Sequence, residues 1–321
     1  MNAAAAALQW WGRHSALEPA GPQAGRIDAF WHFLWIVAAL VLLAVVVALL
    51  YATFRRRRGD LPEHAGAGTR TAVTGAVGIT VLILLVFLGI NFGTGRALTI
   101  PPDDALLVRV SGKQWWWEIT YPGRPASNQV TTANELHVPV GVPVVVELTS
   151  SDVIHSFWPA NLVGKRDLIP GETSSIWFQA DSAGTYRAQC AEYCGHQHAK
   201  MAMLVVAQPR DSFDRWLARQ RDSARTPADS VAARGQEVFL ASSCVMCHSV
   251  RGTPAGSRIG PDLTHFASRR TIAACTLPNT RGHLAGWILD PQRIKPGSRM
   301  PPNQLSPDDL HALLAYLETL R

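Results

Sequence analysis

The sequence predicts a multidomain membrane protein with a pair of transmembrane helices, then an all-β domain, then an all-α domain. Three observations predict this order. Two uncharged apolar runs lie in the first third of the chain, and short β-type runs separated by proline and glycine fill the middle third. An amphipathic helix with clear N-terminal signals closes the chain. With 321 residues, the chain is long enough for these parts.

The two apolar runs extend from Phe33 to Tyr51 and from Ala72 to Ile90. Each has nineteen residues, close to the roughly 20 that a helix needs to cross the hydrocarbon core. Buried core helices are the alternative, but apolar residues all round the helix argue against it. The first run starts too far from the N-terminus, and is too long, for an ordinary cleaved signal peptide, so we expect a retained anchor.

The arginines predict how the two spans are oriented. The loop between them contains Arg55 to Arg58 and Arg70, whereas only Arg13 and Arg26 precede the first span. Because positive charge concentrates on the cytoplasmic side, we expect this loop in the cytoplasm and everything after residue 91 outside.

Charge is distributed unevenly along the chain. Residues 1–94 carry a net +3, residues 95–207 a net −2 and residues 208–321 a net +5. A basic C-terminal third raises the question of nucleic acid, but the sequence has no aromatic-plus-basic motif of that kind. We expect this third to dock on its acidic neighbour instead.

The middle third favours an all-β sandwich or barrel, because its β-type runs follow one another closely with no helical pattern between them. A loop between the last two runs contains CAEYCGHQHAKM, residues 190 to 201, with two thiols and two imidazoles in twelve residues. The runs are LLVRV, WWWEIT, NELHV, PVVVEL, SSIWF, GTYRAQC and MAMLVV.

That loop has metal-ligand spacing. Cys190, Cys194, His198 and Met201 follow at intervals of four, four and three residues, and His155 precedes them by 35. Tetrahedral zinc is one alternative, since Cys and His in fours suit it. Zinc gains little from a thioether, whereas thiolates, imidazoles and methionine together form the set that selects copper.

A disulfide between Cys190 and Cys194 is the second alternative, because the expected compartment is oxidising. It would leave both histidines and Met201 without a role. Two thiolates can instead bridge two copper ions, each then taking one histidine and one weak axial ligand. Met201 is such a ligand on one side, and a backbone carbonyl could serve on the other.

The last third contains Cys244-Val245-Met246-Cys247-His248, the Cys-x-x-Cys-His pattern of covalently bound c-type haem. A redox Cys-x-x-Cys pair is the alternative. An apolar GQEVFL before the motif, IGPDL after it and the methionine of GSRMPP favour haem. Cys244 and Cys247 would bind the porphyrin and His248 the iron. Met300 would be the sixth ligand, which raises the reduction potential.

The chain ends with SPDDLHALLAYLETLR, in which Ser306 has the character of an N-cap and Pro307 that of the first helical residue. This helix resembles the closing helix of class I cytochromes c, which crosses the first helix of that fold. The resemblance implies contacts between the two helices through Gly235, Phe239, Leu313 and Tyr316.

HSFWPANLVGKRDLIPG followed by CAEYCGHQHAKM resembles the dinuclear copper (CuA) domain of cytochrome c oxidase subunit II. The resemblance covers residues 26 to 207 and implies a cupredoxin-like Greek-key β-barrel. It implies bridging thiolates, terminal imidazoles and axial ligands from Cys190 and Cys194, His155 and His198, and Met201 and the Glu192 carbonyl. The Glu192 carboxylate becomes a candidate magnesium ligand at the boundary with subunit I.

KQWWWEI resembles the aromatic patch of that family, where the first tryptophan, here Trp115, receives electrons from cytochrome c. Strand alternation cannot bury three adjacent tryptophans on one side, so at least one should face solvent or a partner. The chain departs from the family at the second span, which lacks the acidic residue associated with proton uptake. Glu63, the nearest acid, lies well upstream.

Residues outside these motifs have structural interpretations. Cys275 has no partner and is expected to be buried filler. His137 is expected to be structural and His196 solvated, while Met203 shares a strand face with Met201 and the family spacing favours the latter. Surface or structural positions are expected for His265, His283 and His311.

As a whole, the chain resembles subunit II of a caa-type haem-copper oxidase, in which a cytochrome c domain is fused to the copper subunit. The implied cofactors are dinuclear copper and haem c, with magnesium at the subunit I boundary. The implied parts are an external segment (1–29), two transmembrane helices (30–94), the copper domain (95–208), a linker (209–228) and the cytochrome c domain (229–321).

The resemblance implies a route from an external donor to haem c, to the copper centre and to subunit I, where oxygen is reduced to water with proton translocation. Subunits I and III and a membrane are the implied partners. The implied location is the bacterial inner membrane, with both redox domains periplasmic. A stand-alone membrane-anchored haem c and copper electron carrier is the alternative; a copper-delivery protein would have no use for haem.

Overall fold

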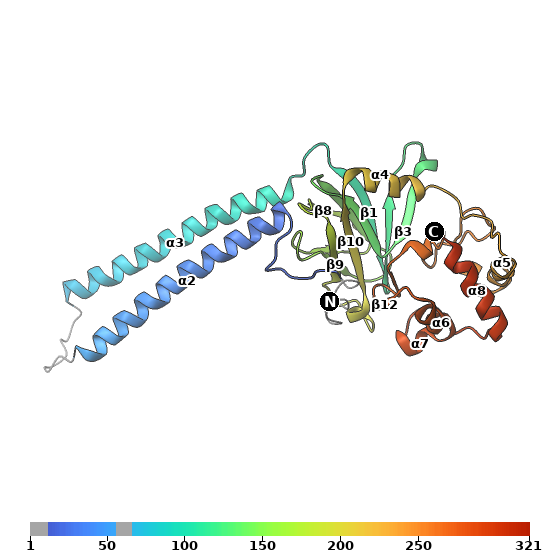
Figure 1. The fold of residues 1–321 in the computed structure, drawn as a ribbon. Helices are drawn as coiled ribbons and strands as arrows, with labels where there is room; N and C mark the ends of the chain where they lie inside the picture. Colours follow the sequence, from blue (N-terminus) through green and yellow to red (C-terminus); the bar gives the residue numbers. More distant parts are fainter. Residues whose placement is uncertain (1–11, 56–65) are drawn as a thin grey trace, which may run out of the picture. The chain divides into compact units, whose positions relative to one another are not determined.

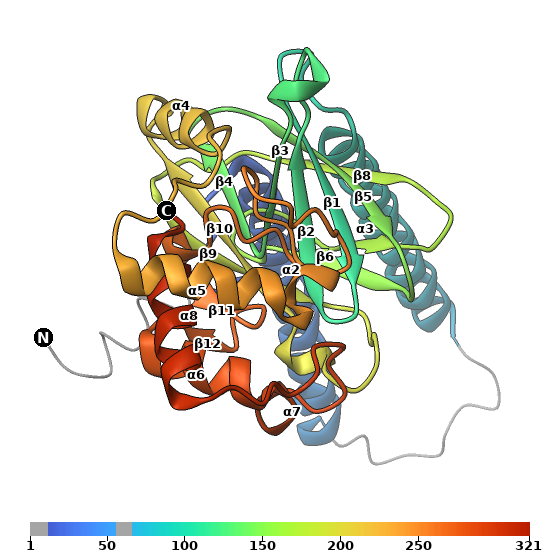
Figure 2. The ribbon, with the colours of Figure 1, turned by 90° about the vertical axis from the view of Figure 1, so that its right-hand side faces the viewer.

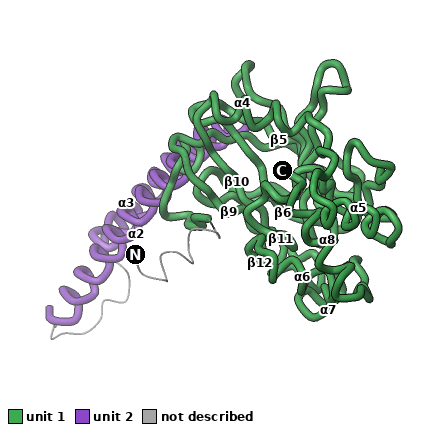
Figure 3. Tube along the Cα trace, turned by 45° about the vertical axis from the view of Figure 1, so that its right-hand side comes forward, with its two compact units in different colours: residues 1–24, 101–321 green, residues 25–100 purple. Residues whose placement is uncertain are grey.

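The computed structural model describes residues 12–55 and 66–321. These residues form two compact units, one within residues 1–24 and 101–321 and the other within residues 25–100 (Figure 3). Most of the arginine-rich loop behind the expected cytoplasmic orientation lies outside the described residues, because residues 56–58 fall in the gap. Glu63 lies outside them as well.

Two long helices account for the smaller unit: α2 (Pro22–Phe54) and α3 (Ala67–Thr99), each of 33 residues. At 1.5 Å per residue each is about 50 Å long, more than the roughly 30 Å hydrocarbon core. Apolar side chains along both helices are exposed, and the rings of Phe33 and Phe87 meet edge to face at 5.5 Å. Both helices are long and apolar enough to cross a membrane.

A β-sandwich occupies the first part of the larger unit (Figures 1 and 2). One sheet has the strand order β3-β2-β1-β5-β8 and the other β4-β10-β9-β6-β7. The strands are β1 (Leu106–Lys113), β2 (Trp116–Tyr121), β3 (Val130–Ala133), β4 (Glu135–Pro139), β5 (Val144–Ser150), β6 (His155–Trp158), β7 (Arg166–Leu168), β8 (Ser174–Phe178), β9 (Gly184–Cys190) and β10 (Ala202–Gln208).

Alternating side chains fill the space between the two sheets. In β5, Val144, Val146 and Leu148 are buried while the residues between them are half-buried, as a period of two requires. β1 pairs in parallel with β5, and β10 in parallel with β4, which gives the crossovers of a Greek-key sandwich. All seven runs expected from the sequence form strands, and the cupredoxin-like fold class is confirmed.

The second part of the larger unit is helical, with its own apolar core. Its elements are α5 (Ser230–Ala241), α6 (Arg281–Leu289), α7 (Pro291–Ile294), α8 (Pro307–Thr319), short 3-10 turns at Ser243–Met246 and Phe266–Ser268, and the two-residue strands β11 (Thr271–Ile272) and β12 (Leu277–Pro278). Two further 3-10 turns, Ala126–Asn128 and His198–Lys200, belong to the sandwich.

Helices α5 and α8 cross closely in this core. A Cβ on Gly235 would lie 1.9 Å from the Ala312 carbonyl oxygen, and the rings of Phe239 and Tyr316 meet at 5.8 Å. The Ser306 hydroxyl accepts a hydrogen bond from the backbone N–H of Asp309. The expected helix start and the crossing of the two helices are therefore confirmed.

Residues 209–228, expected as a linker, begin with helix α4 (Arg210–Arg219), which packs on the sandwich. Its Trp216 stacks on His137 at 4.0 Å and meets Tyr121 edge to face. Directly after α4, the Arg251 guanidinium of the helical part donates hydrogen bonds to the carbonyls of Gln220 and Arg221. One end of this segment is thus bound to the sandwich and the other to the helical part.

Replacing Gly235 with Ala should destabilise the helical part by about 1–3 kcal/mol, because the added methyl overlaps the α8 backbone. Thermal unfolding of the full chain in detergent, followed by the signal of the helical part, measures this. Gly282→Ala is the matched control, since a Cβ there meets nothing within 4 Å. Equal unfolding temperatures for both variants would contradict this packing.

Candidate metal and cofactor sites

A group of sulfur and nitrogen atoms gathers where β9 ends. Cys190 is the last residue of β9, and its neighbour strand β6 begins with His155. The Cys190 Sγ lies 3.7 Å from the Cys194 Sγ and 3.9 Å from the His155 Nδ1. All three side chains are buried. Residues 35 apart in the sequence therefore offer ligand atoms to one point.

The remaining expected ligands complete this group. The His198 Nδ1 and the Met201 Sδ lie 3.6 Å and 3.8 Å from the Cys194 Sγ. The Glu192 carbonyl oxygen lies 3.3 Å from the Cys190 Sγ. Each sulfur thus has one imidazole nitrogen and one weak donor beside it, which is the symmetry that two thiolate-bridged ions need.

The two thiols interact directly. A hydrogen bond from Cys194 holds the pKa of Cys190 well below its usual range, and the same interaction raises the pKa of Cys194. The pair therefore loses its first proton readily and keeps the second until a cation replaces it, so metal binding here should release a proton.

Asp152 orients His155. Its Oδ1 lies 2.9 Å from the His155 Nε2, which leaves the Nδ1 directed at the sulfurs. Burial raises the pKa of Asp152, but hydrogen bonds from the Gln114 N–H and from His155 outweigh it and hold the pKa below its usual value. The carboxylate therefore stays ionised and positions the imidazole, as outer-sphere carboxylates do in metal sites.

The donor set fits copper better than the alternatives. Metal–sulfur bonds of about 2.3 Å let two sulfurs that share an ion lie up to about 4.6 Å apart, and these lie 3.7 Å apart. A disulfide would need about 2.05 Å. A buried thioether beside two thiolates and two imidazoles is a soft set, which selects copper over zinc.

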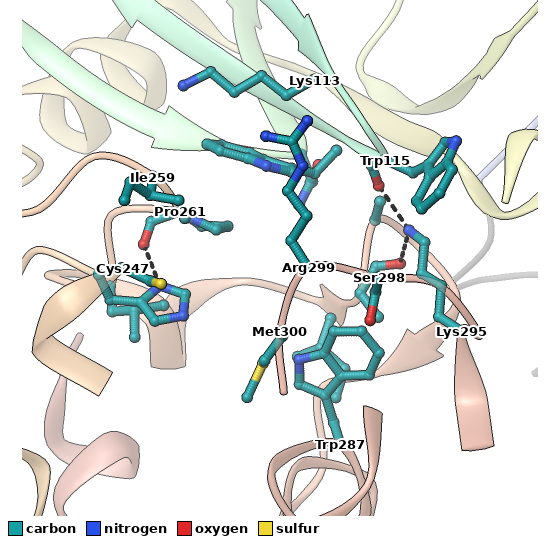
Figure 4. Close-up of a pocket in the computed structure, with 18 of the residues that line it drawn as sticks. Lys113, Trp115, Cys247, Ile259, Pro261, Trp287, Lys295, Ser298, Arg299 and Met300 are labelled. Carbon is teal, nitrogen blue, oxygen red and sulfur yellow. Dashed lines mark hydrogen bonds between the residues drawn. The ribbon is translucent and has the colours of Figure 1, made fainter. Parts of the chain in front are cut away.

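A second site lies where the helical part meets the sandwich. A cavity of about 420 Å³ there is lined by Cys244, Cys247, His248 and Met300 of the helical part and by Trp115 and Trp116 of the sandwich. Figure 4 labels Cys247, Met300 and Trp115. Apolar side chains from α5, α6 and α8 line a smaller adjoining cavity that shares Cys244, His248 and Met300 with it. The larger volume lies in the range of pockets for small molecules and cofactors. The expected covalent and axial haem ligands therefore face one largely apolar space.

His248 is held in the tautomer that a haem ligand needs. Its Nδ1 lies 2.7 Å from the Pro261 carbonyl oxygen and can only donate there, so the Nε2 keeps its lone pair. Burial lowers the pKa of His248, which keeps the ring neutral. The Gln292 side-chain amide donates a 2.8 Å hydrogen bond to the Met300 carbonyl oxygen. This bond fixes the backbone of the residue that carries the thioether.

Trp115 touches the metal-ligand loop from the side of the cavity. Its indole Nε1 and the Gln114 amide each donate a 2.9 Å hydrogen bond to the Cys194 carbonyl. Trp115 also lines the cavity, whereas Trp117 is fully buried in the sandwich. Trp115 therefore lies between the two sites, and its role in receiving electrons stays a prediction.

The other histidines and cysteines lie as expected. His196 is exposed, and Met203 is buried in the sandwich core. Cys275 is buried beside Thr271, and burial raises its pKa to about 11, so it is an inert thiol. The roles of Asp152 and Gln114 were not predicted from the sequence. The one available signal for Asp152 was its position three residues before His155.

Two family models match the chain: "Cytochrome C oxidase subunit II, periplasmic domain" over residues 123–208 and "Cytochrome c" over residues 232–321. Cytochrome c oxidase subunit 2 of Alkalihalophilus pseudofirmus is 36% identical over 319 residues, which cover 96% of this chain and 91% of the relative. Cytochrome c oxidase subunit 2 of Bacillus sp. (strain PS3) is 30% identical over 290 residues, covering 84% and 80%.

Among solved structures, the periplasmic domain of subunit II of cytochrome oxidase of Bradyrhizobium japonicum is similar. It has 29% sequence identity and a TM-score of 0.36, and covers 38% of this chain and 97% of that chain.

Asp152→Asn should weaken copper binding by about 10- to 100-fold, because the neutral amide no longer holds His155 with its Nδ1 toward the sulfurs. Copper titration of the apoprotein against a competing chelator measures the affinity. Asp181→Asn, on an exposed loop, is the control. Equal affinity in the two variants would show that Asp152 does not orient the ligand.

Proposed function

Because the chain belongs to the cytochrome c oxidase subunit II family, we propose that it is the electron inlet of a proton-pumping terminal oxidase. It is an electron-transfer subunit of an oxidoreductase and a membrane-anchored protein with periplasmic domains. In the proposed route, electrons pass from haem c to a dinuclear copper centre and then to subunit I, where oxygen becomes water. We call residues 95–208 the copper domain and residues 229–321 the haem domain.

One observation carries this proposal: two sulfurs 3.7 Å apart, each beside an imidazole nitrogen 3.6–3.9 Å away. A single-copper site needs one thiolate, so the second thiolate supports a dinuclear centre. Cys190 and Cys194 would bridge the ions and His155 and His198 would complete them. Met201 and the Glu192 carbonyl, which lie beside the two sulfurs, would serve as the weak axial ligands.

Haem and copper, when bound, supply one-electron redox chemistry, and the residues here hold them in place and exclude water. Cys244 and Cys247 would attach the porphyrin, while His248 and Met300 would bind the iron. Ligands that keep their positions in both redox states lower the reorganisation that electron transfer requires. The backbone hydrogen bonds on His248 and Met300 support that role.

The surface beside the copper ligands supports docking on another subunit. Tyr193 is 74% exposed and Ile154 43% exposed, so apolar groups lie next to the ligand loop. We assign this surface, with Glu192 as a candidate magnesium ligand, to subunit I. Helix α3 lacks the acidic residue that the family associates with proton uptake. Subunit III, an external electron donor and the bacterial inner membrane complete the proposed setting.

The test is a reduced-minus-oxidised optical spectrum, with metal analysis, of the tagged protein purified from its native membrane in mild detergent. We expect haem c, two coppers per chain and a co-purifying haem a band. Haem c and copper with no second haem and no larger subunit would contradict the oxidase assignment and favour a stand-alone electron carrier.

Met300→Ala should leave the haem covalently attached but lower its reduction potential, because attachment uses the cysteines and the thioether stabilises the reduced iron. Redox titration of the haem band measures this. Met246→Leu is the control, since Met246 lies between the same cysteines but is 69% exposed. An unchanged potential in Met300→Ala would remove Met300 from the ligand set.

A further inference from the structure

The chain that leads into Met300 lies against the copper-ligand loop. Residues 294–299, which we call the docking segment, contact residues next to four of the proposed copper ligands. Because this segment precedes Met300 directly, any movement of it relative to the copper loop also moves the proposed iron ligand.

Two contacts reach the backbone of the docking segment from the copper loop. The Gln197 amide donates a 2.7 Å hydrogen bond to the Pro296 carbonyl, and the Lys200 amine donates to the Ile294 carbonyl. Gln197 is buried and lies next to His198, while Lys200 lies next to Met201. The loop that supplies His198 and Met201 is thus the loop that binds this segment.

Two basic side chains of the docking segment also contact the copper domain. The Lys295 amine is 3% exposed and donates hydrogen bonds of 2.7 Å and 3.2 Å to the Trp115 and Ala273 carbonyls (Figure 4). The Arg299 guanidinium lies 3.6 Å from the Asp152 carboxylate. Both basic side chains of the haem domain therefore contact residues that position copper ligands.

Each of these two basic side chains contacts a residue that in turn contacts a proposed copper ligand. Trp115, which accepts from Lys295, donates to the Cys194 carbonyl. Asp152, which pairs with Arg299, also orients His155. Two chains of contacts, Lys295–Trp115–Cys194 and Arg299–Asp152–His155, therefore connect the docking segment to the copper site.

The backbone of the docking segment is shaped for this position. Gly297 has a φ of +82°, a left-handed conformation that other residues rarely adopt, and a Cβ there would lie 3.7 Å from the Trp115 ring. The turn at Gly297 lies between Lys295 and Arg299 in the chain, and both basic side chains contact the copper domain.

We infer that the docking segment holds the haem domain on the copper loop, and that Lys295 and Arg299 are positioning residues for electron transfer from haem c to copper. This inference rests on the proposed function for the direction of electron flow. The docking itself rests only on the contacts above.

The test uses the full chain, with haem and copper bound, in detergent. Hydrogen exchange of peptides that span residues 114–118 and 294–300 reports how often the domains separate. Separation should increase about tenfold or more in Lys295→Met, which loses two hydrogen bonds from a buried charge. Arg299→Gln, with a partly exposed ion pair, should show an increase of about two- to fivefold.

Electron transfer from photoreduced haem c to copper, followed optically in the same variants, should slow in the same order while both optical spectra stay as in the wild type. Arg299→Lys, which keeps the cation, should restore most of the rate. Arg293→Gln is the matched control, because Arg293 is exposed on α7, directly before the docking segment, and its side chain makes no hydrogen bond or ion pair among the described residues.

Unchanged exchange in both Lys295→Met and Arg299→Gln would overturn the inference. Failure of the proposed function would differ from this result. In that case the wild type would show protected peptides but no transfer from haem c to copper, so docking would stand without its electron-transfer role.

Discussion

The metal site depends on two backbone hydrogen bonds at the end of β9. The Cys190 N–H donates to the Met201 carbonyl, and the Ala191 N–H donates to the Ser156 carbonyl, both at 3.0 Å. The first bond joins the two ends of the ligand loop. The second joins Ala191 to the strand that begins with His155. The donor atoms are therefore assembled by the sandwich, and a metal ion need not order the loop when it binds.

The contact between the haem and copper domains relies on charge placed in a largely buried setting. Burial lowers the pKa of Lys295 to about 7, so keeping this residue charged costs free energy that its two carbonyl acceptors offset only in part. Arg270 adds further contacts, with its backbone N–H on Glu135 and its guanidinium on Thr185. Polar contacts of this kind specify one orientation more than they add stability. The opposite net charges of the two parts agree with this arrangement.

Much of the fold could be predicted because its signals are local. The two apolar helices, the longer strands and the capped last helix follow from periodicity, and the ligands follow from their spacing. Strands β6 and β7 have four residues or fewer, too few for a period to be visible in the sequence. Lys295 acts through partners that only the folded chain brings near, so no local pattern marks it. Asp152 lies three residues before His155, but this spacing alone does not show that its carboxylate orients the ring. Helix α4 falls in a charged, helix-prone segment, but its packing on the sandwich through Phe213 and Trp216 is evident only in the folded chain.

The segment that joins the two redox domains has almost no slack. Trp216 anchors it to the sandwich, and four residues later Arg251 of the haem domain holds the Gln220 carbonyl. While these contacts hold, the haem domain stays on the copper domain and does not move as a freely tethered carrier would. Every molecule is made with one donor and one acceptor already in register, so their stoichiometry cannot vary with expression. A longer connecting segment would let the haem domain move away from the copper domain, and electron transfer would then require it to return to its docking position.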